Sequence, residues 1–217
     1  MITIVNYGSG NIQAICNIYS RLSIPVVVAS TPEELRKGEK IILPGVGAFD
    51  QAMGELERSG LRVALDDCVL ERRRPILGIC VGMQLLANRS EEGMLPGLGW
   101  IDGVVKRFEP ARFLQGTRLP HMGWNTAEPV RKDPLLTGVD LETGFYFLHS
   151  YYFSCMNPGD VLARTDYGGH YASVVNRGNI YGVQFHPEKS HQAGIQVLRN
   201  FALHVGQAAS PDAPAGS

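Results

Sequence analysis

The chain has 217 residues, with 20 Lys and Arg against 21 Asp and Glu, which gives a formal net charge of −1. This length suits one large α/β domain, and the balanced charge lacks the basic excess of a dedicated nucleic-acid-binding protein. Hydrophobic residues make up 44% and charged residues 19%, so the chain can bury a sizeable core, and its longest apolar stretches are far shorter than the roughly 20 residues of a membrane helix.

The chain begins with an apolar, strand-like segment, and its first basic residue is Arg21, so the cationic start of a secretory signal is missing. The cysteines at positions 16, 68, 80 and 155 show no C-x-x-C spacing, and a domain of this size needs no disulfides. We therefore expect reduced thiols and a cytoplasmic location, with each cysteine serving as a core residue or as a nucleophile.

The first hundred residues alternate short apolar strands with helices. Strands are predicted at 2–5, 26–29, 41–43 and 75–79. Helices are predicted at 12–22, 50–58 and 60–73. Strands that are apolar at consecutive positions are typical of a parallel sheet covered on both faces. The alternation predicts a doubly wound α/β fold of flavodoxin-like type, with a mostly parallel central sheet and flanking helices.

Strands dominate the second half of the chain. They are predicted at 104–108, 145–153, 161–165, 172–176 and 180–185. With few helices between them, they predict an antiparallel extension at one edge of the sheet. A final helix is expected over 190–205. We expect a single domain over 1–205, followed by a disordered tail over 206–217 that lacks aromatic and branched aliphatic residues.

The segment G-I-C-V-G at 78–82 joins a predicted strand to a predicted helix, with Cys80 at its centre. This is the pattern of a nucleophile elbow, whose sharp turn needs glycines because side chains there would clash with the neighbouring strand and helix. The helix start favours a thiolate, and the N–H group of Val81 is positioned to bind an oxyanion. The alternative is a buried structural cysteine between two incidental glycines.

A thiolate nucleophile needs a base and a group that orients the base. His186 ends an apolar strand, where α/β sheets place their active sites, and Glu188 follows two residues later. The alternatives for His186 are a surface histidine or a metal site shared with His191. A structural zinc site would need four ligands, usually with paired cysteines, so we expect neither a metal nor a cofactor.

The segment P-G-V-G at 44–47 follows the third predicted strand, so it lies at the same edge of the sheet. Two glycines around one small residue allow the backbone to approach a ligand or to reorient. We interpret Val46 and Gly47 as a second oxyanion element beside Val81, against the alternative of an ordinary turn. G-S-G-N at 8–11 only weakly suggests dinucleotide binding, because Gln13 stands where a third glycine is required and no acidic residue occurs near 28–31.

These motifs resemble those of the class I, triad-type glutamine amidotransferases, which hydrolyse the side-chain amide of glutamine and pass the ammonia to a synthase. Within that family the chain is most similar to the glutaminase subunits of imidazole glycerol phosphate synthase. This similarity is carried by N-Y-G-S-G-N at 6–11, P-G-V-G-A-F at 44–49, G-M-Q-L-L at 82–86, S-E-E-G at 90–93, P-H-M-G-W-N at 120–125, F-L-H-S-Y-Y at 147–152 and G-V-Q-F-H-P-E-K-S at 182–190.

The resemblance implies a role for particular residues. Cys80 would attack the amide carbon, His186 would protonate the departing ammonia and activate water, and Glu188 would orient His186. The residues implied to hold glutamine are Gly47, Gln84, Glu92, Ser150 and Tyr151. The residues implied to face a cyclase subunit, a (β/α)₈ barrel that receives the ammonia, are Trp124, Tyr146 and Lys189. From the sequence alone, Trp124 could equally belong to the core.

The expected function is that of an enzyme subunit whose activity is low until its partner is bound, with the P-G-V-G loop as the switch. A second hypothesis is another amidotransferase subunit, such as that of anthranilate synthesis, or a free-standing cysteine hydrolase of similar fold. A third is a non-catalytic interaction subunit that retains the fold, against which the intact set of Cys80, His186 and Glu188 argues.

Overall fold

The computed structural model describes residues 1–109 and 118–206, so the predicted tail lies outside the described residues except for Gly206. Five parallel strands form the centre of the molecule in the order β2-β1-β3-β4-β13. Their bounds are β1 Ile2–Val5, β2 Val26–Ala29, β3 Lys40–Gly45, β4 Ile76–Cys80 and β13 Ile180–Val183. This is the strand order of a flavodoxin-like sheet, as predicted.

Apart from Lys40 at the start of β3, the inner strands of this sheet are buried along their whole length, which explains why their sequences are apolar at consecutive positions. The edge strand β2 departs from the prediction that every strand is covered on both faces. Val27 and Val28 are both exposed, because β2 has a neighbour on one side only.

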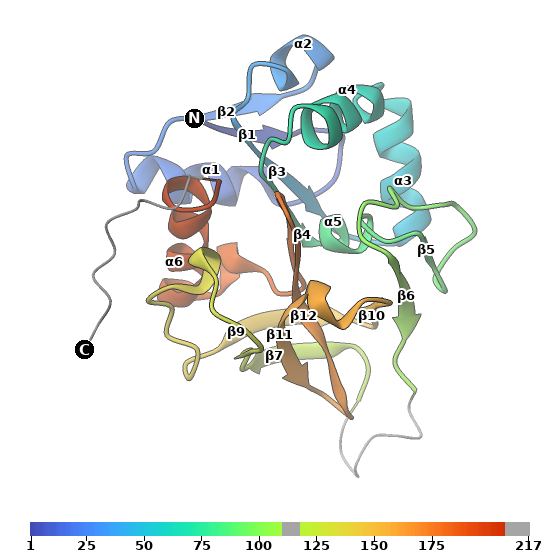
Figure 1. Cartoon of the computed structure of the whole chain (residues 1–217). Helices are drawn as coiled ribbons and strands as arrows, with labels where there is room; N and C mark the ends of the chain where they lie inside the picture. Colours follow the sequence, from blue (N-terminus) through green and yellow to red (C-terminus); the bar gives the residue numbers. More distant parts are fainter. Residues whose placement is uncertain (110–117, 207–217) are drawn as a thin grey trace.

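Helices cover both faces of the parallel strands; α1 and α6 lie on one side and α3 and α4 on the other (Figure 1). The helices are α1 Ile12–Arg21, α2 Pro32–Leu35, α3 Phe49–Arg58, α4 Arg62–Asp66, α5 Val81–Gln84 and α6 His191–Leu203. The helix predicted over 60–73 is α4 continued by a π-helical turn, η1 Asp67–Glu71. The sequence analysis missed α2, although Thr31 and Glu34 form a capping box at its start.

The second half continues the same sheet with antiparallel strands, as expected for an extension at one edge. Beyond β13 the order is β12-β10-β6-β5, in which the terminal pair β6–β5 is parallel; β11 pairs with β12, and β8 pairs with β11. The bounds are β5 Arg89–Ser90, β6 Gly103–Arg107, β8 Glu128–Pro129, β10 Tyr151–Cys155, β11 Val161–Asp166 and β12 His170–Arg177. Short 3₁₀ turns follow β8, β10 and β13, namely η3 Pro134–Leu136, η4 Pro158–Asp160 and η5 Pro187–Lys189.

The segment 145–153, predicted as one strand, is instead divided between two sheets. β9 Phe145–His149 pairs with β7 His121–Asn125 in a separate two-stranded sheet, whereas β10 belongs to the main sheet. Ser150 lies at the break. The prediction of one strand over 180–185 was also too long, because pairing of β13 stops at Val183. No helix in the described part of the chain has both the length and the apolar character that a membrane span requires.

Candidate active site

A cavity of about 510 Å³ opens at the carboxyl ends of β3 and β4, where doubly wound sheets bind their ligands. It brings together nearly all of the residues that the sequence analysis selected. Its walls consist of Val46, Gly47, Cys80, Val81, Gln84, Glu92, Pro120, Leu148, His149, Ser150, Tyr151, His186 and Lys189. Segments far apart in the sequence therefore meet at one edge of the sheet.

Cys80 stands at a strained turn between β4 and α5. Its backbone has φ = 55° and ψ = −111°, a conformation that costs a residue with a side chain about 1–3 kcal/mol. The flanking glycines are required by space, since a Cβ atom on Gly78 would lie 2.6 Å from the carbonyl oxygen of Gly82, and one on Gly82 would lie 1.9 Å from that of Leu43. These contacts confirm the steric reasoning behind the predicted elbow.

His186 and Glu188 form a buried pair beside Cys80. His186 Nδ1 lies 2.9 Å from Glu188 Oε1, and His186 also has a hydrogen bond with the side chain of Cys80. Burial acts to lower the pKa of His186, but the hydrogen bonds and charges of Cys80 and Glu188 outweigh it and raise the pKa to about 10. The imidazole is therefore held in its cationic form, with Nδ1 directed at the carboxylate and the ring facing the thiol.

Two glutamine side chains connect the thiol to the opposite wall of the cavity. Gln184 Nε2 lies 3.9 Å from Cys80 Sγ, and Gln184 Oε1 accepts a hydrogen bond from Gln84 Nε2 at 3.1 Å. Gln84 Nε2 also donates to the carbonyl oxygen of Tyr151 at 3.1 Å. Gln84 is thus held within the wall by bonds to Tyr151 of β10 and to Gln184, the residue after β13. Sequence reasoning missed Gln184, although it lies only two residues from His186.

The P-G-V-G loop is held by the N-terminal motif at 6–11. The Tyr7 hydroxyl donates to the carbonyl oxygen of Pro44 at 2.7 Å. The Ser9 hydroxyl donates to the carbonyl oxygen of Val46 and accepts from its N–H, each at 3.0 Å. The N–H group of Val46, expected as an oxyanion donor, is therefore bonded to Ser9 in this structure. Gly47 has φ = 88°, a conformation that favours glycine.

Glu92 lies in the cavity wall at the start of helix α3. Its Oε2 accepts a hydrogen bond from the N–H of Phe49 at 2.9 Å, which supplies the side-chain cap that Ala48 cannot. In return, Asp50 accepts from the N–H groups of Met94 and Leu95 at 2.8 and 3.0 Å. Glu92 and Asp50 thus hold helix α3 and the loop of residues 92–95 together. Sequence reasoning gave no sign of this arrangement.

An apolar surface lies outside the cavity on the sheet of β7 and β9. Trp124 is paired with Tyr146 across the two strands, and Met122 with Leu148, so all four side chains share the outward face. Trp124 is 46% exposed, which excludes the core position that the sequence left open. Leu148 also lines the cavity, so the apolar surface reaches the cavity mouth.

Lys189 and His191 border this surface. Lys189 Nζ lies 5.7 Å from the ring centroid of Tyr146, and the His191 ring stacks on Trp124 with centroids 5.0 Å apart. His191 thus packs against an aromatic ring rather than sharing a metal with His186. Among residues 1–109 and 118–206, no group of three or more His, Cys, Asp or Glu side chains is arranged to hold a metal ion.

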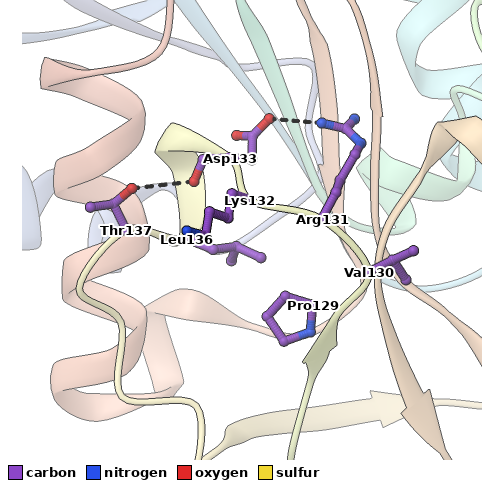
Figure 2. A pocket seen from close by; sticks show the side chains of 7 residues that line it. All are labelled: Pro129, Val130, Arg131, Lys132, Asp133, Leu136 and Thr137. Carbon is purple, nitrogen blue, oxygen red and sulfur yellow. Dashed lines mark hydrogen bonds and ion pairs between the residues drawn. The ribbon is translucent and has the colours of Figure 1, made fainter. Parts of the chain in front are cut away.

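A second cavity, of about 490 Å³, lies in the segment from β8 to η3 and is formed by residues 129–133, Leu136 and Thr137 (Figure 2). The guanidinium group of Arg131 in its wall forms an ion pair with Asp133 at 3.3 Å and donates a hydrogen bond to Asn176 at 2.6 Å. No cysteine, serine or histidine is among the residues that line it. The chemistry therefore concentrates at the cavity of Cys80.

A sequence model of the family described as glutamine amidotransferase class-I matches residues 3–205. The chain therefore belongs to the class-I glutamine amidotransferase family. Within it, the chain is 54% identical over 202 residues to the imidazole glycerol phosphate synthase subunit HisH of Bdellovibrio bacteriovorus, and 48% identical to that of Leptospira interrogans. Both alignments cover 93% of this chain and 99% of the relative. The resemblance to amidotransferase subunits of this synthase, predicted from the motifs, is confirmed.

Solved structures support the fold. A crystal structure of a putative GMP synthase subunit from Thermoplasma acidophilum has a TM-score of 0.68 at 20% identity, covering 93% of this chain and 91% of its own. A glutamine amidotransferase structure gives the same TM-score at 21% identity, covering 93% and 97% of the two chains. At this identity the comparison confirms the predicted fold class.

Proposed function

We propose that this chain hydrolyses L-glutamine to L-glutamate and ammonia with Cys80, His186 and Glu188 as its catalytic residues. The observation that carries the proposal is that Cys80, at a strained elbow, and His186 line one cavity while Glu188 contacts His186 from behind the cavity wall, in a chain from the amidotransferase family. Cysteine acts as a nucleophile in its thiolate form, and the cationic His186 beside Cys80 supplies the proton that the reaction moves.

The reaction takes place in two halves. The thiolate attacks the amide carbon, the N–H of Val81 stabilises the oxyanion, and the C–N bond breaks as His186 gives its proton to the leaving nitrogen. Ammonia departs and leaves a thioester on Cys80. His186, now neutral, removes a proton from water; the resulting hydroxide attacks the thioester and releases glutamate, so that the thiolate and the cationic His186 are restored. Glu188 keeps His186 oriented in both halves.

The cavity also supplies groups for the amino-acid end of the substrate. Glu92 provides a carboxylate for the α-ammonium group, an arrangement favoured by charge. Gly47, Gln84, Ser150 and Tyr151 form the remaining wall that we assign to glutamine. Their positions around one volume support this assignment.

The partner that we propose is the cyclase subunit of imidazole glycerol phosphate synthase, a (β/α)₈ barrel, in a heterodimer. The relatives named as subunits of that synthase support this partner. It would use the ammonia to form imidazole glycerol phosphate and AICAR in histidine biosynthesis, in the cytoplasm, where the nucleophilic thiol stays reduced. The exposed surface around Trp124, Tyr146 and Lys189 would dock the cyclase, because it adjoins the cavity mouth from which ammonia leaves.

We further propose that the P-G-V-G loop controls the activity. With the N–H of Val46 bonded to Ser9, one of the proposed donors of the oxyanion hole is engaged within the chain. Reorientation of the Val46–Gly47 segment would complete the hole, and docking of the partner beside the cavity would favour that state. Free glutaminase activity is therefore expected to be low.

The test is glutamine hydrolysis by the purified chain alone, with the cyclase subunit, and with the cyclase subunit plus its nucleotide ligand. Strong activation by the liganded partner is expected, together with a loss of at least about a thousandfold in Cys80→Ala. Full activity without the partner would leave the triad intact and contradict the proposed control. Absence of activity in every mixture would contradict the proposed reaction and favour a non-catalytic subunit.

A further inference from the structure

Three buried side chains outside the proposed triad form one line of hydrogen bonds. The hydroxyl of Tyr171 on β12 lies 3.1 Å from Nδ1 of His121 on β7 and 3.2 Å from Nε2 of His149 on β9. His149 Nδ1 lies 2.8 Å from the carbonyl oxygen of Tyr151, and His121 Nε2 lies 3.4 Å from Asn125 Nδ2. The reaction steps described above use none of the three side chains.

Donors and acceptors fix the direction of this line. A carbonyl oxygen only accepts, so Nδ1 of His149 carries the proton and Nε2 accepts from the Tyr171 hydroxyl. The oxygen of Tyr171 then accepts from Nδ1 of His121, whose Nε2 accepts from the amide of Asn125. Each bond has one donor and one acceptor only when both imidazoles are neutral.

The surroundings of the two rings favour the neutral form. The ring of His121 lies between Phe147 and Tyr167, with centroids 4.7 and 3.8 Å away and nearly parallel planes. Burial lowers the pKa of His121 to about 4 and that of His149 to about 3. The arrangement of donors therefore does not change at physiological pH.

The line ends where the cavity wall passes from one sheet to the other. His149 is the last residue of β9, Tyr151 is the first of β10, and Ser150 lies between them without a strand assignment. By reaching the carbonyl two residues ahead, His149 closes the turn over Ser150. Gln84 bonds the same carbonyl oxygen from the other side. The orientation of the Tyr151–Tyr152 peptide, and with it the position of Tyr151 in the wall, is thus fixed by two side chains.

We propose that His149, itself held by Tyr171 and His121, is a positioning residue for glutamine, because it fixes the Ser150–Tyr151 wall against which the amino-acid end of the substrate binds. The inference rests on the proposed function, which assigns that wall to glutamine. A purely structural line would affect folding stability and leave the affinity for glutamine unchanged.

The test compares steady-state glutamine hydrolysis by variants of the partner-bound enzyme. His149→Leu removes the bond to Tyr151, and we expect KM for glutamine to rise about tenfold while kcat changes less than about twofold, since one buried hydrogen bond is lost. His149→Asn places an amide N–H near the position of Nδ1, so it is expected to restore most of the loss. Tyr171→Phe keeps the ring and removes only the hydroxyl, and an intermediate rise in KM is expected.

Two controls separate positioning from folding. Tyr19→Phe removes a hydroxyl that is equally buried and bonds the carbonyl oxygen of Leu198 far along the chain, so it should lower stability without changing KM. Alkylation of Cys80 by iodoacetamide needs no amino-acid pocket and is expected to proceed at about the wild-type rate in His149→Leu.

The outcomes separate this inference from the proposed function. Suppose that the wild type hydrolyses glutamine but KM is unchanged in His149→Leu and Tyr171→Phe. This result overturns the positioning role and leaves the proposed function standing. If Tyr19→Phe and Tyr171→Phe raise KM equally and lower stability equally, the positioning role is also overturned. If the wild type does not hydrolyse glutamine with its partner, the proposed function is overturned and this inference with it.

Discussion

The hydroxyl group of Ser9 binds the N–H and the carbonyl oxygen of Val46 at the same time, each at 3.0 Å. A single side chain from the first loop thus holds the two peptide groups on either side of Val46, which lines the cavity. Dinucleotide binding, which the sequence of this motif suggests only weakly, is not favoured by a hydroxyl that bonds the chain itself.

Ser9→Ala removes both of these bonds. Val46 is 43% exposed, so water can satisfy its N–H and the oxyanion loop can reorient more readily. We expect hydrolysis of glutamine without the partner to rise about five- to tenfold, the shift that about 1 kcal/mol produces. Ser30→Ala is the matched control, because Ser30 bonds Asn6 in the same loop and does not touch residues 44–47. An unchanged partner-free rate would contradict the role of Ser9.

The raised pKa of His186 predicts a pH dependence of stability. The pKa is about 10 in the folded chain and 6.5 in the unfolded chain, so the stabilisation is fully present below pH 6.5 and is lost as pH rises through 10. The free energy of unfolding, measured by denaturant titration between pH 6.5 and 10, should therefore fall with pH. Glu188→Gln should flatten this dependence, and equal slopes for both proteins would show that the ion pair is not its source.

Glu92→Gln separates the charge of this side chain from its capping role. A glutamine can still accept from the N–H of Phe49, so the stability of α3 should change little. The α-ammonium group loses a charged partner, and KM for glutamine should rise at least about tenfold. Glu91→Gln is the control, because Glu91 does not line the cavity and instead accepts a hydrogen bond from the N–H of Arg107. Equal KM values for both variants would remove Glu92 from the substrate site.

Trp124→Ala tests the docking surface by calorimetric titration with the cyclase subunit. Trp124 lies outside the core, so folding stability should change by less than about 1 kcal/mol. Kd should rise at least about tenfold, since large aromatic side chains dominate most interfaces. Val63→Ala on α4 removes another exposed apolar side chain and should leave Kd unchanged. A similar Kd for both variants would place the interface elsewhere.

Gly82→Ala tests how tightly the elbow packs against β3. Its Cβ would lie 1.9 Å from the carbonyl oxygen of Leu43, a backbone atom that cannot move aside. We expect a loss of more than about 3 kcal/mol in the free energy of unfolding. Gly60→Ala is the comparison: a Cβ atom there would have no neighbour within 4 Å, and the only cost is the unfavourable φ of 71°. We expect this variant to lose about 1 kcal/mol in the free energy of unfolding. Similar losses in both variants would show that packing at the elbow is loose.

The parallel half of the fold was predictable because buried strands have apolar residues at consecutive positions. β7 was missed because His121, Gly123 and Asn125 interrupt the apolar pattern of a strand that is exposed on one face. The break at Ser150 was missed for the opposite reason, since aromatic residues continue through it, and only pairing with two different sheets separates β9 from β10.

Although Glu92, Ser150 and Tyr151 were found only through the family resemblance, the reacting groups were predictable because Cys80 and His186 follow the apolar segments of β4 and β13 in the parallel sheet. The line of His121, Tyr171 and His149 was not, since its members come from three strands whose pairing no local pattern reveals. The bond between Ser9 and Val46 likewise depends on contacts between distant loops. Short-range motifs therefore identified the reacting groups, whereas the groups that support them became visible only in three dimensions.

The positive φ of Cys80 has a consequence for relatives of this chain. The strain belongs to the backbone, so alanine or serine at this position would inherit it, and only glycine would relieve it. A descendant that no longer needed a nucleophile would gain stability from glycine at position 80. The residue found there should therefore distinguish subunits that still perform chemistry from those kept by selection only as binding partners.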